Sequence, residues 1–161
     1  MRGEGRGGES DVGAEDGPAD DDGKIAASNE PRAGSNEITM NANSFRFENL
    51  QIWQRAAGIS SPLFKLAEAL DGRRYYRFAE QLRAASLSIT NNIAEGSGSD
   101  SDADFANFVN TARRSVFEVA NMLILFSREG YLLKAEIDPL LDELIEQSKM
   151  LKSFRQSLKK S

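Results

Sequence analysis

The chain has 161 residues and a formal net charge of −5, and it contains neither cysteine nor histidine. A chain of this length is expected to form one domain. Without cysteine it can form no disulfide and no thiolate site, and without histidine it lacks the commonest general base and metal ligand of proteins. The composition therefore excludes the most frequent catalytic and metal-binding chemistries.

The excess of acidic charge is confined to the N-terminal part of the chain. Residues 1–44 hold 4 Lys+Arg and 10 Asp+Glu, whereas residues 45–161 hold 16 and 15. All nine Phe, all three Tyr and the one Trp follow residue 44. A Gly/Asp/Glu-rich segment without aromatics cannot bury enough apolar surface to offset its chain entropy. We therefore predict a disordered tail over 1–44, and Met40 leaves open the alternative that translation starts there.

The first element predicted after the tail is a helix over 50–70. The run Phe45–Phe47 is expected to be an extended lead-in, and Asn49 is the predicted N-cap. Pro62 predicts a bend, and Asp71-Gly72 is expected to end the helix. One face of the helix carries the residues expected in the core, which are Trp53, Ala56, Ala57, Ser60, Phe64 and Ala67, with Ile52, Leu63 and Leu70 beside them.

A second helix is predicted over 73–95, followed by a break at Gly96-Ser97-Gly98. Ser101, with Asp104 three residues later, resembles a capping box that starts a third helix over 102–129. The apolar arc of the second helix consists of Tyr75, Phe78, Leu82, Ile89 and Ile93. The wide stripe of the third helix consists of Phe105, Phe108, Val109, Ala112, Val116, Val119, Ala120, Leu123 and Phe126.

Gly130 ends the third helix, and a fourth is predicted to begin within 134–139. Pro139 is expected only in its first turn, where a missing backbone donor costs nothing. Its core face is predicted from Ile137, Leu140, Leu141, Leu144, Ser148, Leu151 and Leu158.

Four long helices joined by short loops place neighbours in the sequence antiparallel to each other. The predicted fold class is therefore all-α, an antiparallel up-down-up-down four-helix bundle over 45–161 preceded by the disordered acidic tail. No secretory signal and no apolar run long enough to span a bilayer is visible, so we expect a cytoplasmic protein without a membrane partner.

The chain lacks the residues needed for the chemistries that are common in four-helix bundles. A di-iron or di-manganese site needs Glu-x-x-His motifs, and a phosphate-binding loop needs a Gly-x-x-x-x-Gly-Lys-Ser/Thr run. Neither occurs, and without His or Cys no nucleophile–base–orienter set can be assembled, short of unusual Ser/Lys or carboxylate chemistry. We expect no catalytic residue, no metal and no cofactor, and hence no enzyme.

A polar stripe lies on the second helix, away from its apolar arc. Gln81, Ser88, Asn92 and Glu95 fall on one side, and Gly96 follows directly. One interpretation is a subunit interface, or local capping of the turn that follows. The alternative is a small-molecule-binding or catalytic pocket that uses Asn92 and Glu95.

The third helix has a second apolar flank beside its core stripe. Phe117 and Ile124 lie seven residues apart, with Arg113 on the same side. Exposed on a monomer, these side chains would form a sticky patch. The pattern predicts a homo-oligomer.

Two basic groups are weak candidates for nucleic-acid contact. Each is also typical of a solvated helix face, and a near-neutral domain argues against strong non-specific DNA binding. The first group is Arg73, Arg74, Arg77 and Arg83, and the second is the C-terminal set with Lys152, Arg155, Lys159 and Lys160.

The run Gln81-Leu82-Arg83, with Ala85, Ser88-Ile89 and Asn92–Gly98, resembles the hallmark of the bacterial four-helix-bundle proteins. These are also called the 23S rRNA intervening-sequence, or S23-type, family. Further matching runs are Phe47–Gln54, Phe105, Ser115–Glu118 and Gly130–Leu132. The resemblance implies an antiparallel bundle that assembles as a ring-like homopentamer. It also implies a link to RNA, because such genes can lie inside rRNA insertions and a related accessory protein of diversity-generating retroelements binds nucleic acid and a reverse transcriptase.

The chain departs from the family pattern at Ala84, at Thr90-Asn91 and at Ser99, where the family has Arg, Pro-Ser and Arg. These changes weigh against an inherited RNA contact and leave the expected fold intact. The function predicted from the sequence is a non-enzymatic, homo-oligomeric scaffold that binds RNA or a nucleoprotein partner, with the Asn92/Glu95 pocket as the alternative.

Overall fold

The computed structural model describes residues 44–159, so the predicted tail lies outside the described residues except for Ser44. A short 3₁₀ helix and four α-helices make up this part, and no strand occurs in it. Their bounds are η1 (Arg46–Asn49), α1 (Gln51–Gly72), α2 (Tyr76–Ser97), α3 (Asp102–Arg128) and α4 (Lys134–Leu158).

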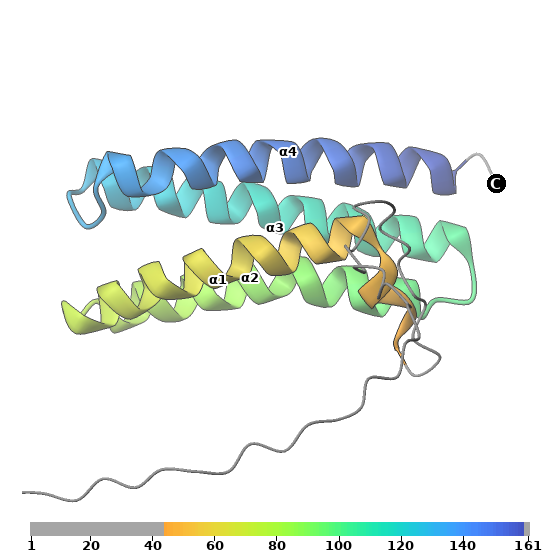
Figure 1. Ribbon diagram of the computed structural model, residues 1–161, viewed down its shortest axis with the longest axis horizontal. Helices are drawn as coiled ribbons and strands as arrows, with labels where there is room; N and C mark the ends of the chain where they lie inside the picture. Colours follow the sequence, from red (N-terminus) through yellow and green to blue (C-terminus); the bar gives the residue numbers. More distant parts are fainter. Residues whose placement is uncertain (1–43, 160–161) are drawn as a thin grey trace, which may run out of the picture. The chain divides into compact units, whose positions relative to one another are not determined.

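The helices form an up-down-up-down bundle (Figure 1). Contacts run around a ring in which α1 packs on α2, α2 on α3, α3 on α4, and α4 back on α1, the last pair touching least. Two contacts fix the antiparallel directions. Arg46, before α1, donates to the Ser97 carbonyl at the end of α2 (3.1 Å), and the Phe105 ring at the start of α3 lies 5.3 Å from that of Phe154 near the end of α4. The predicted all-α, antiparallel four-helix bundle is confirmed for the described residues.

The core is one continuous apolar cluster to which all four helices contribute. The predicted faces of α2 and α3 are largely correct, because Leu82, Ile89 and Ile93 are buried and seven of the nine residues predicted for α3 are buried. On α1, six of the nine predicted core residues are buried, but the buried face is rotated from the predicted one. Ile59 and Leu66 are buried, whereas three side chains that we placed in the core are only half-buried at its edge: Trp53, Ala57 and Phe64.

The segment before α1 is not extended, as we had predicted, but folds into the single 3₁₀ turn of η1. The Glu48 amide donates to the Phe45 carbonyl (3.0 Å), and a Glu48 carboxylate oxygen accepts the Phe45 amide (2.8 Å). The prediction of Asn49 as N-cap was also wrong. Leu50 occupies that position without a side-chain bond, and the Asn49 amide donates to the Ser44 hydroxyl (3.3 Å).

The two helix-internal prolines are accommodated. α1 is helical throughout Gln51–Gly72, across Pro62. α4 begins at Lys134, so Pro139 lies beyond its first turn, contrary to our prediction. The start of α4 is set by Glu136, whose carboxylate accepts the Leu133 amide (2.7 Å). The predicted Ser101 cap of α3 is confirmed, because its hydroxyl accepts the Asp104 amide (3.2 Å).

Helices α1 and α3 end in the same way, with a residue in the left-handed region. At the end of α1 this residue is Arg74 (φ 66°), and the next amide, of Tyr75, reaches back to the Leu70 carbonyl (2.9 Å). At the end of α3 it is Gly130 (φ 74°), followed by the corresponding bond of Tyr131. Both are Schellman motifs, for which glycine is the usual residue. α1 ends at Gly72 as predicted, but the left-handed position falls on an arginine.

Candidate functional site

The polar stripe of α2 lies along the seam with α3. The hydroxyls of Ser88 and Ser115 are 2.9 Å apart. The Asn92 amide donates to the Ser88 carbonyl (2.7 Å) and to its hydroxyl (3.2 Å). The Asn92 Nδ2 is therefore engaged within α2, and the Ser88 hydroxyl links this helix to α3.

Gly96 is not in a turn, as the sequence suggested, because α2 continues to Ser97. It is buried, and a Cβ placed on it would lie 2.5 Å from Cδ2 of Phe105 and 2.7 Å from Cβ of Phe108. Real Cβ atoms essentially never come this close to another heavy atom. Gly96 therefore permits a close approach of α2 to α3 that any other residue would prevent.

The remaining members of the stripe face solvent. Gln81 and Glu95 are exposed, and neither forms a hydrogen bond or ion pair with the residues between 44 and 159. Neither Asn92 nor Glu95 lines any of the hollows described below. The structure thus does not gather the two residues into the pocket that the alternative interpretation required.

The flank predicted on α3 is part of a larger α3/α4 apolar patch, which we define as Phe117, Ala120, Ile124, Leu141 and Ile145. These residues line a hollow of about 380 Å³ between the two helices. Phe117 is 55% exposed and Ile145 is 52% exposed. The Arg113 guanidinium lies over the Phe117 ring, 5.1 Å from its centroid. Sequence reasoning missed Ile145, and it placed Leu141 in the core.

A second hollow, the α1/α2 apolar groove, lies between the other two helices. It measures about 340 Å³, and its apolar lining consists of Phe47, Trp53, Ala57, Phe64, Leu87 and Ala94. The Phe47 and Trp53 rings pack at 5.0 Å, and Leu87 is 45% exposed. This groove was not predicted from the sequence, because the large aromatic residues of α1 were expected in the core.

The first basic group is divided by the structure. Arg73 donates to the Tyr131 carbonyl and lies 5.3 Å from the Tyr75 ring centroid. Arg83 forms an ion pair with Asp71 (2.5 Å). Arg74 and Arg77 are exposed and form no ion pair within the part of the chain that is described.

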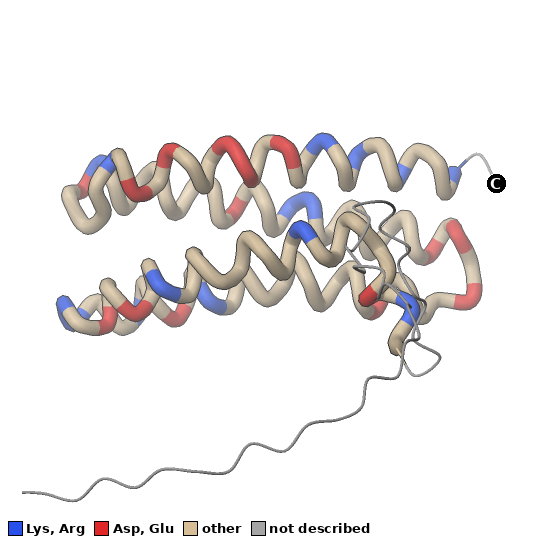
Figure 2. Tube along the Cα trace, in the orientation of Figure 1, with Lys and Arg blue, Asp and Glu red and all other residues tan. Residues whose placement is uncertain are grey.

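The second basic group belongs to a helix with segregated charge. Between Ala135 and Gln147 every charged residue of α4 is acidic, and from Lys149 to its end every charged residue is basic (Figure 2). Lys152, Arg155 and Lys159 are spaced three and four residues apart and so share one side of the helix, whereas Lys160 lies outside the described residues. At the boundary, a hydrogen bond from Lys149 (2.6 Å) and its charge lower the pKa of the Glu146 carboxyl.

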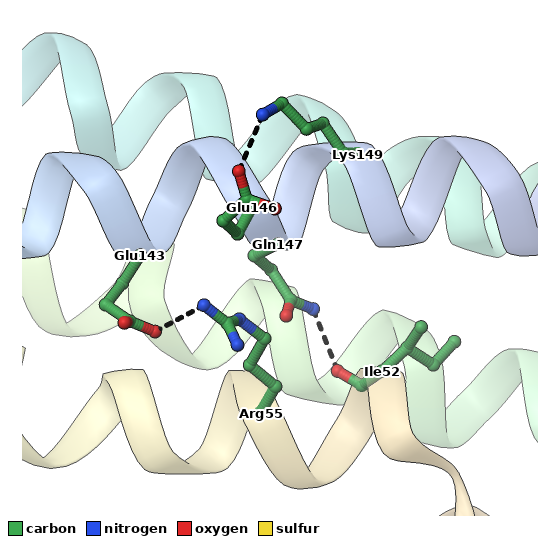
Figure 3. A network of polar contacts seen from close by, with 6 residues as sticks. All are labelled: Ile52, Arg55, Glu143, Glu146, Gln147 and Lys149. Carbon is green, nitrogen blue, oxygen red and sulfur yellow. Dashed lines mark hydrogen bonds and ion pairs between the residues drawn. The ribbon is translucent and has the colours of Figure 1, made fainter.

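The seam between α1 and α4 contains a polar network that sequence reasoning missed (Figure 3). Gln147 is fully buried, and its Nε2 donates to the Ile52 carbonyl (2.8 Å). Arg55 pairs with Glu143 nearby (2.6 Å). Within residues 44–159, Oε1 of Gln147 and Nε of Arg55 have no hydrogen-bond partner. The available signal was the position of Gln147, three residues after Leu144 and four before Leu151, on the core stripe itself.

The described residues contain neither a cluster of metal ligands nor a helix that could span a membrane. No group of three or more Asp or Glu side chains could hold a metal ion. Among the helices of this part, none combines the length and hydropathy needed to cross a bilayer.

These residues define an antiparallel four-helix bundle. Its α2/α3 seam is close and depends on a glycine, and two of its sides carry an apolar hollow. The sequence model of the 23S rRNA-intervening sequence protein matches residues 48–153, and the chain belongs to this family. A crystal structure of a protein of unknown function from the S23 ribosomal protein family of Bacteroides thetaiotaomicron is similar, with 23% identity and a TM-score of 0.62. The match covers 65% of this chain and 97% of that one and supports the fold. Curated proteins provide no match.

Proposed function

We propose that this protein is a non-enzymatic bundle that associates with copies of itself into a scaffold. The observation that carries the proposal is the pair of apolar hollows, the α3/α4 apolar patch and the α1/α2 apolar groove. Because the helices contact one another in the ring order α1, α2, α3, α4, these two surfaces lie on opposite sides of the bundle.

Two different surfaces on opposite sides favour a head-to-tail contact, in which the patch of one copy meets the groove of the next. Such heterologous contacts produce a ring when the rotation between copies closes. The ring of five that the family resemblance implies is one such closure. Phe117, Ile145 and Leu87 are each about half exposed, so burying the remaining surface of one such side chain contributes about 0.8–1.5 kcal/mol, half the value for a fully exposed side chain.

The test uses one charged substitution on each surface, measured by light scattering. Phe117→Asp and Leu87→Asp should each be monomeric, whereas the wild-type protein is an oligomer. A mixture of the two variants should form a dimer, because each supplies the one surface that the other has lost. As a control, Leu125→Asp places the same charge on α3 outside both surfaces, and it should remain oligomeric.

Two results would contradict this assembly. A wild-type monomer at micromolar concentration would remove the scaffold proposal altogether. An unaffected Leu87→Asp oligomer, beside a monomeric Phe117→Asp, would show instead that the patch pairs with itself.

A second candidate function is RNA binding, favoured by the basic half of α4. Lys152, Arg155 and Lys159 present three cations on one side of the helix, and cations of this kind neutralise the phosphates of a nucleic acid. The basic residues also suit the negative end of the helix dipole, so the salt dependence of binding is the test that separates RNA binding from a purely structural role. Binding of a labelled RNA should weaken steeply between about 50 and 200 mM salt. Lys152→Glu should weaken it, whereas Lys65→Glu on α1 should not, and no binding at low salt would end this candidate.

A further inference from the structure

Two consecutive tyrosines at the start of α2 have opposite environments. The Tyr75 ring packs inward, 4.6 Å from the ring of Tyr131 and 6.1 Å from that of Phe78. The next ring, of Tyr76, is 63% exposed. Tyr75 therefore has a packing role in the aromatic cluster at this end of the bundle. No contact among the described residues gives the exposed Tyr76 ring such a role.

The two arginines near Tyr76, Arg74 and Arg77, form no ion pair with the described residues. Arg73 and Arg83, in contrast, are occupied by a carbonyl and by Asp71. Both line a hollow of about 500 Å³ together with Tyr76, and the remaining lining residues are Tyr75, Phe78 and Glu80. An exposed aromatic ring and two arginines that form no ion pair among residues 44–159 thus line the same hollow.

The backbone at Arg74 supports a use for its side chain. Its φ of 66° lies in the left-handed region, where a side chain is sterically disfavoured. The equivalent position at the end of α3 is Gly130, which avoids this cost. A long cationic side chain at a position that suits glycine is consistent with a function for the guanidinium.

We propose that the hollow at the start of α2 binds one nucleotide unit of a single-stranded RNA. The base stacks on the Tyr76 ring, and the Arg74 and Arg77 guanidiniums contact the flanking phosphates. Stacking on an exposed aromatic side chain, combined with nearby cations, is the usual way in which proteins hold single-stranded nucleic acid without base-specific contacts. This inference rests on the RNA-binding candidate and gives it a site distinct from the basic half of α4.

Charge in the hollow predicts a further property. Glu80 faces the same space and opposes a phosphate there, since its carboxylate carries the same sign of charge. Removing this charge with Glu80→Gln should therefore strengthen binding, and most clearly at low salt, where the repulsion is least screened.

The experiment measures fluorescence anisotropy of a labelled oligouridylate of about ten nucleotides. Tyr76→Ala should weaken binding about tenfold, because one stacked base is lost, whereas Tyr76→Phe should bind like the wild type. Arg74→Gly removes the guanidinium while relieving the backbone, and it should lower both the affinity and the salt dependence. Arg77→Glu should weaken binding, and its control is Arg128→Glu, the same change of charge at the same end of the bundle.

Further arms identify the ligand. Duplex RNA of the same length should bind equally well to the wild type and Tyr76→Ala, because its bases cannot stack on the ring. Uridine monophosphate should compete only at far higher concentration than the oligonucleotide if the natural ligand is a strand. Competition at equal concentration would identify a free nucleotide as the ligand and overturn the choice of RNA.

Each failure has a distinct meaning. Wild-type protein that does not bind the oligouridylate at low salt would remove the RNA candidate together with this site. If the wild type binds, Lys152→Glu binds weakly and Tyr76→Ala binds normally, RNA binding stands and the Tyr76 site is wrong. A loss of oligomer mass in Tyr76→Ala would place Tyr76 in a subunit contact, which would also overturn the site.

Discussion

The α2/α3 seam and the α1/α4 seam hold the same bundle together by different means. At the α2/α3 seam, Gly96 leaves room for the Phe105 ring and the Phe108 Cβ of the facing helix, and the hydroxyls of Ser88 and Ser115 bond to each other. At the α1/α4 seam the two helices contact each other less. Gln147 lies across this seam, and its Nε2 is bonded, whereas its Oε1 has no partner among the described residues. Small residues permit close packing, whereas a buried amide stabilises a seam only to the extent that all its atoms are paired.

The largest expected effect comes from closing the space at Gly96. Gly96→Ala should destabilise the bundle by about 1–3 kcal/mol, because the added methyl meets Phe105 and Phe108 and one helix must shift. Urea unfolding measures the change. Gly58→Ala is the matched control, since nothing lies within 4 Å of its added Cβ, and it should instead stabilise α1 by about 0.5–1 kcal/mol. Equal losses in both variants would refute the close-packing role of Gly96.

The next effect has the opposite sign and lies in the other seam. Gln147→Leu should raise the free energy of unfolding by about 1 kcal/mol, because it removes a buried oxygen that has no hydrogen-bond partner. Gln156→Leu makes the same exchange at an exposed position of α4 and should have little effect. A destabilised Gln147→Leu variant would mean that both amide atoms of Gln147 are satisfied in solution, by water for example.

A smaller loss is expected from the paired polar groups of the α2/α3 seam. Ser88→Ala should cost about 1 kcal/mol, because the Ser115 hydroxyl loses its partner across the seam. A double-mutant cycle with Ser115→Ala isolates the contact, and the two effects should fall short of additivity by about 0.5 kcal/mol or more. Strict additivity would show that the two hydroxyls contribute independently.

The smallest effect concerns the ion pair beside Gln147. Glu143→Ala should cost about 0.5 kcal/mol at low salt, because both side chains of the pair remain partly solvated. The difference from the wild type should disappear near 1 M salt, where charges are screened within about 3 Å. A cost that persists at high salt would indicate packing of the side-chain stems instead.

Local sequence signals predicted much of this structure. The apolar residues of α3 recur at the helical period. The Ser101 cap bonds to the amide of Asp104, only three residues further along the chain. For such elements the helical period and the capping chemistry contain the necessary information.

The errors arose where tertiary contacts outweigh local preference. Trp53 and Phe64 are large and apolar, as core residues usually are. They nevertheless lie at the edge of the core, because Ile59 and Leu66 fill the interior. Gln147 is polar but buried because the Ile52 carbonyl lies opposite. The partner of Ser88 could not be read from α2 alone, since it depends on the register of α3, and Gly96 looked like a helix terminator because its aromatic neighbours come from another helix.

The thin contact between α1 and α4 has a consequence for the order of folding. The Gln147–Ile52 bond joins residues 95 positions apart, the longest separation among the side-chain bonds described. Closing so long a loop costs conformational entropy, and the small contact between α1 and α4 buries little apolar surface to offset it. The α1/α4 contact should therefore form last and open first. Native-state hydrogen exchange should find lower opening free energies in the facing parts of α1 and α4 than in α2 and α3.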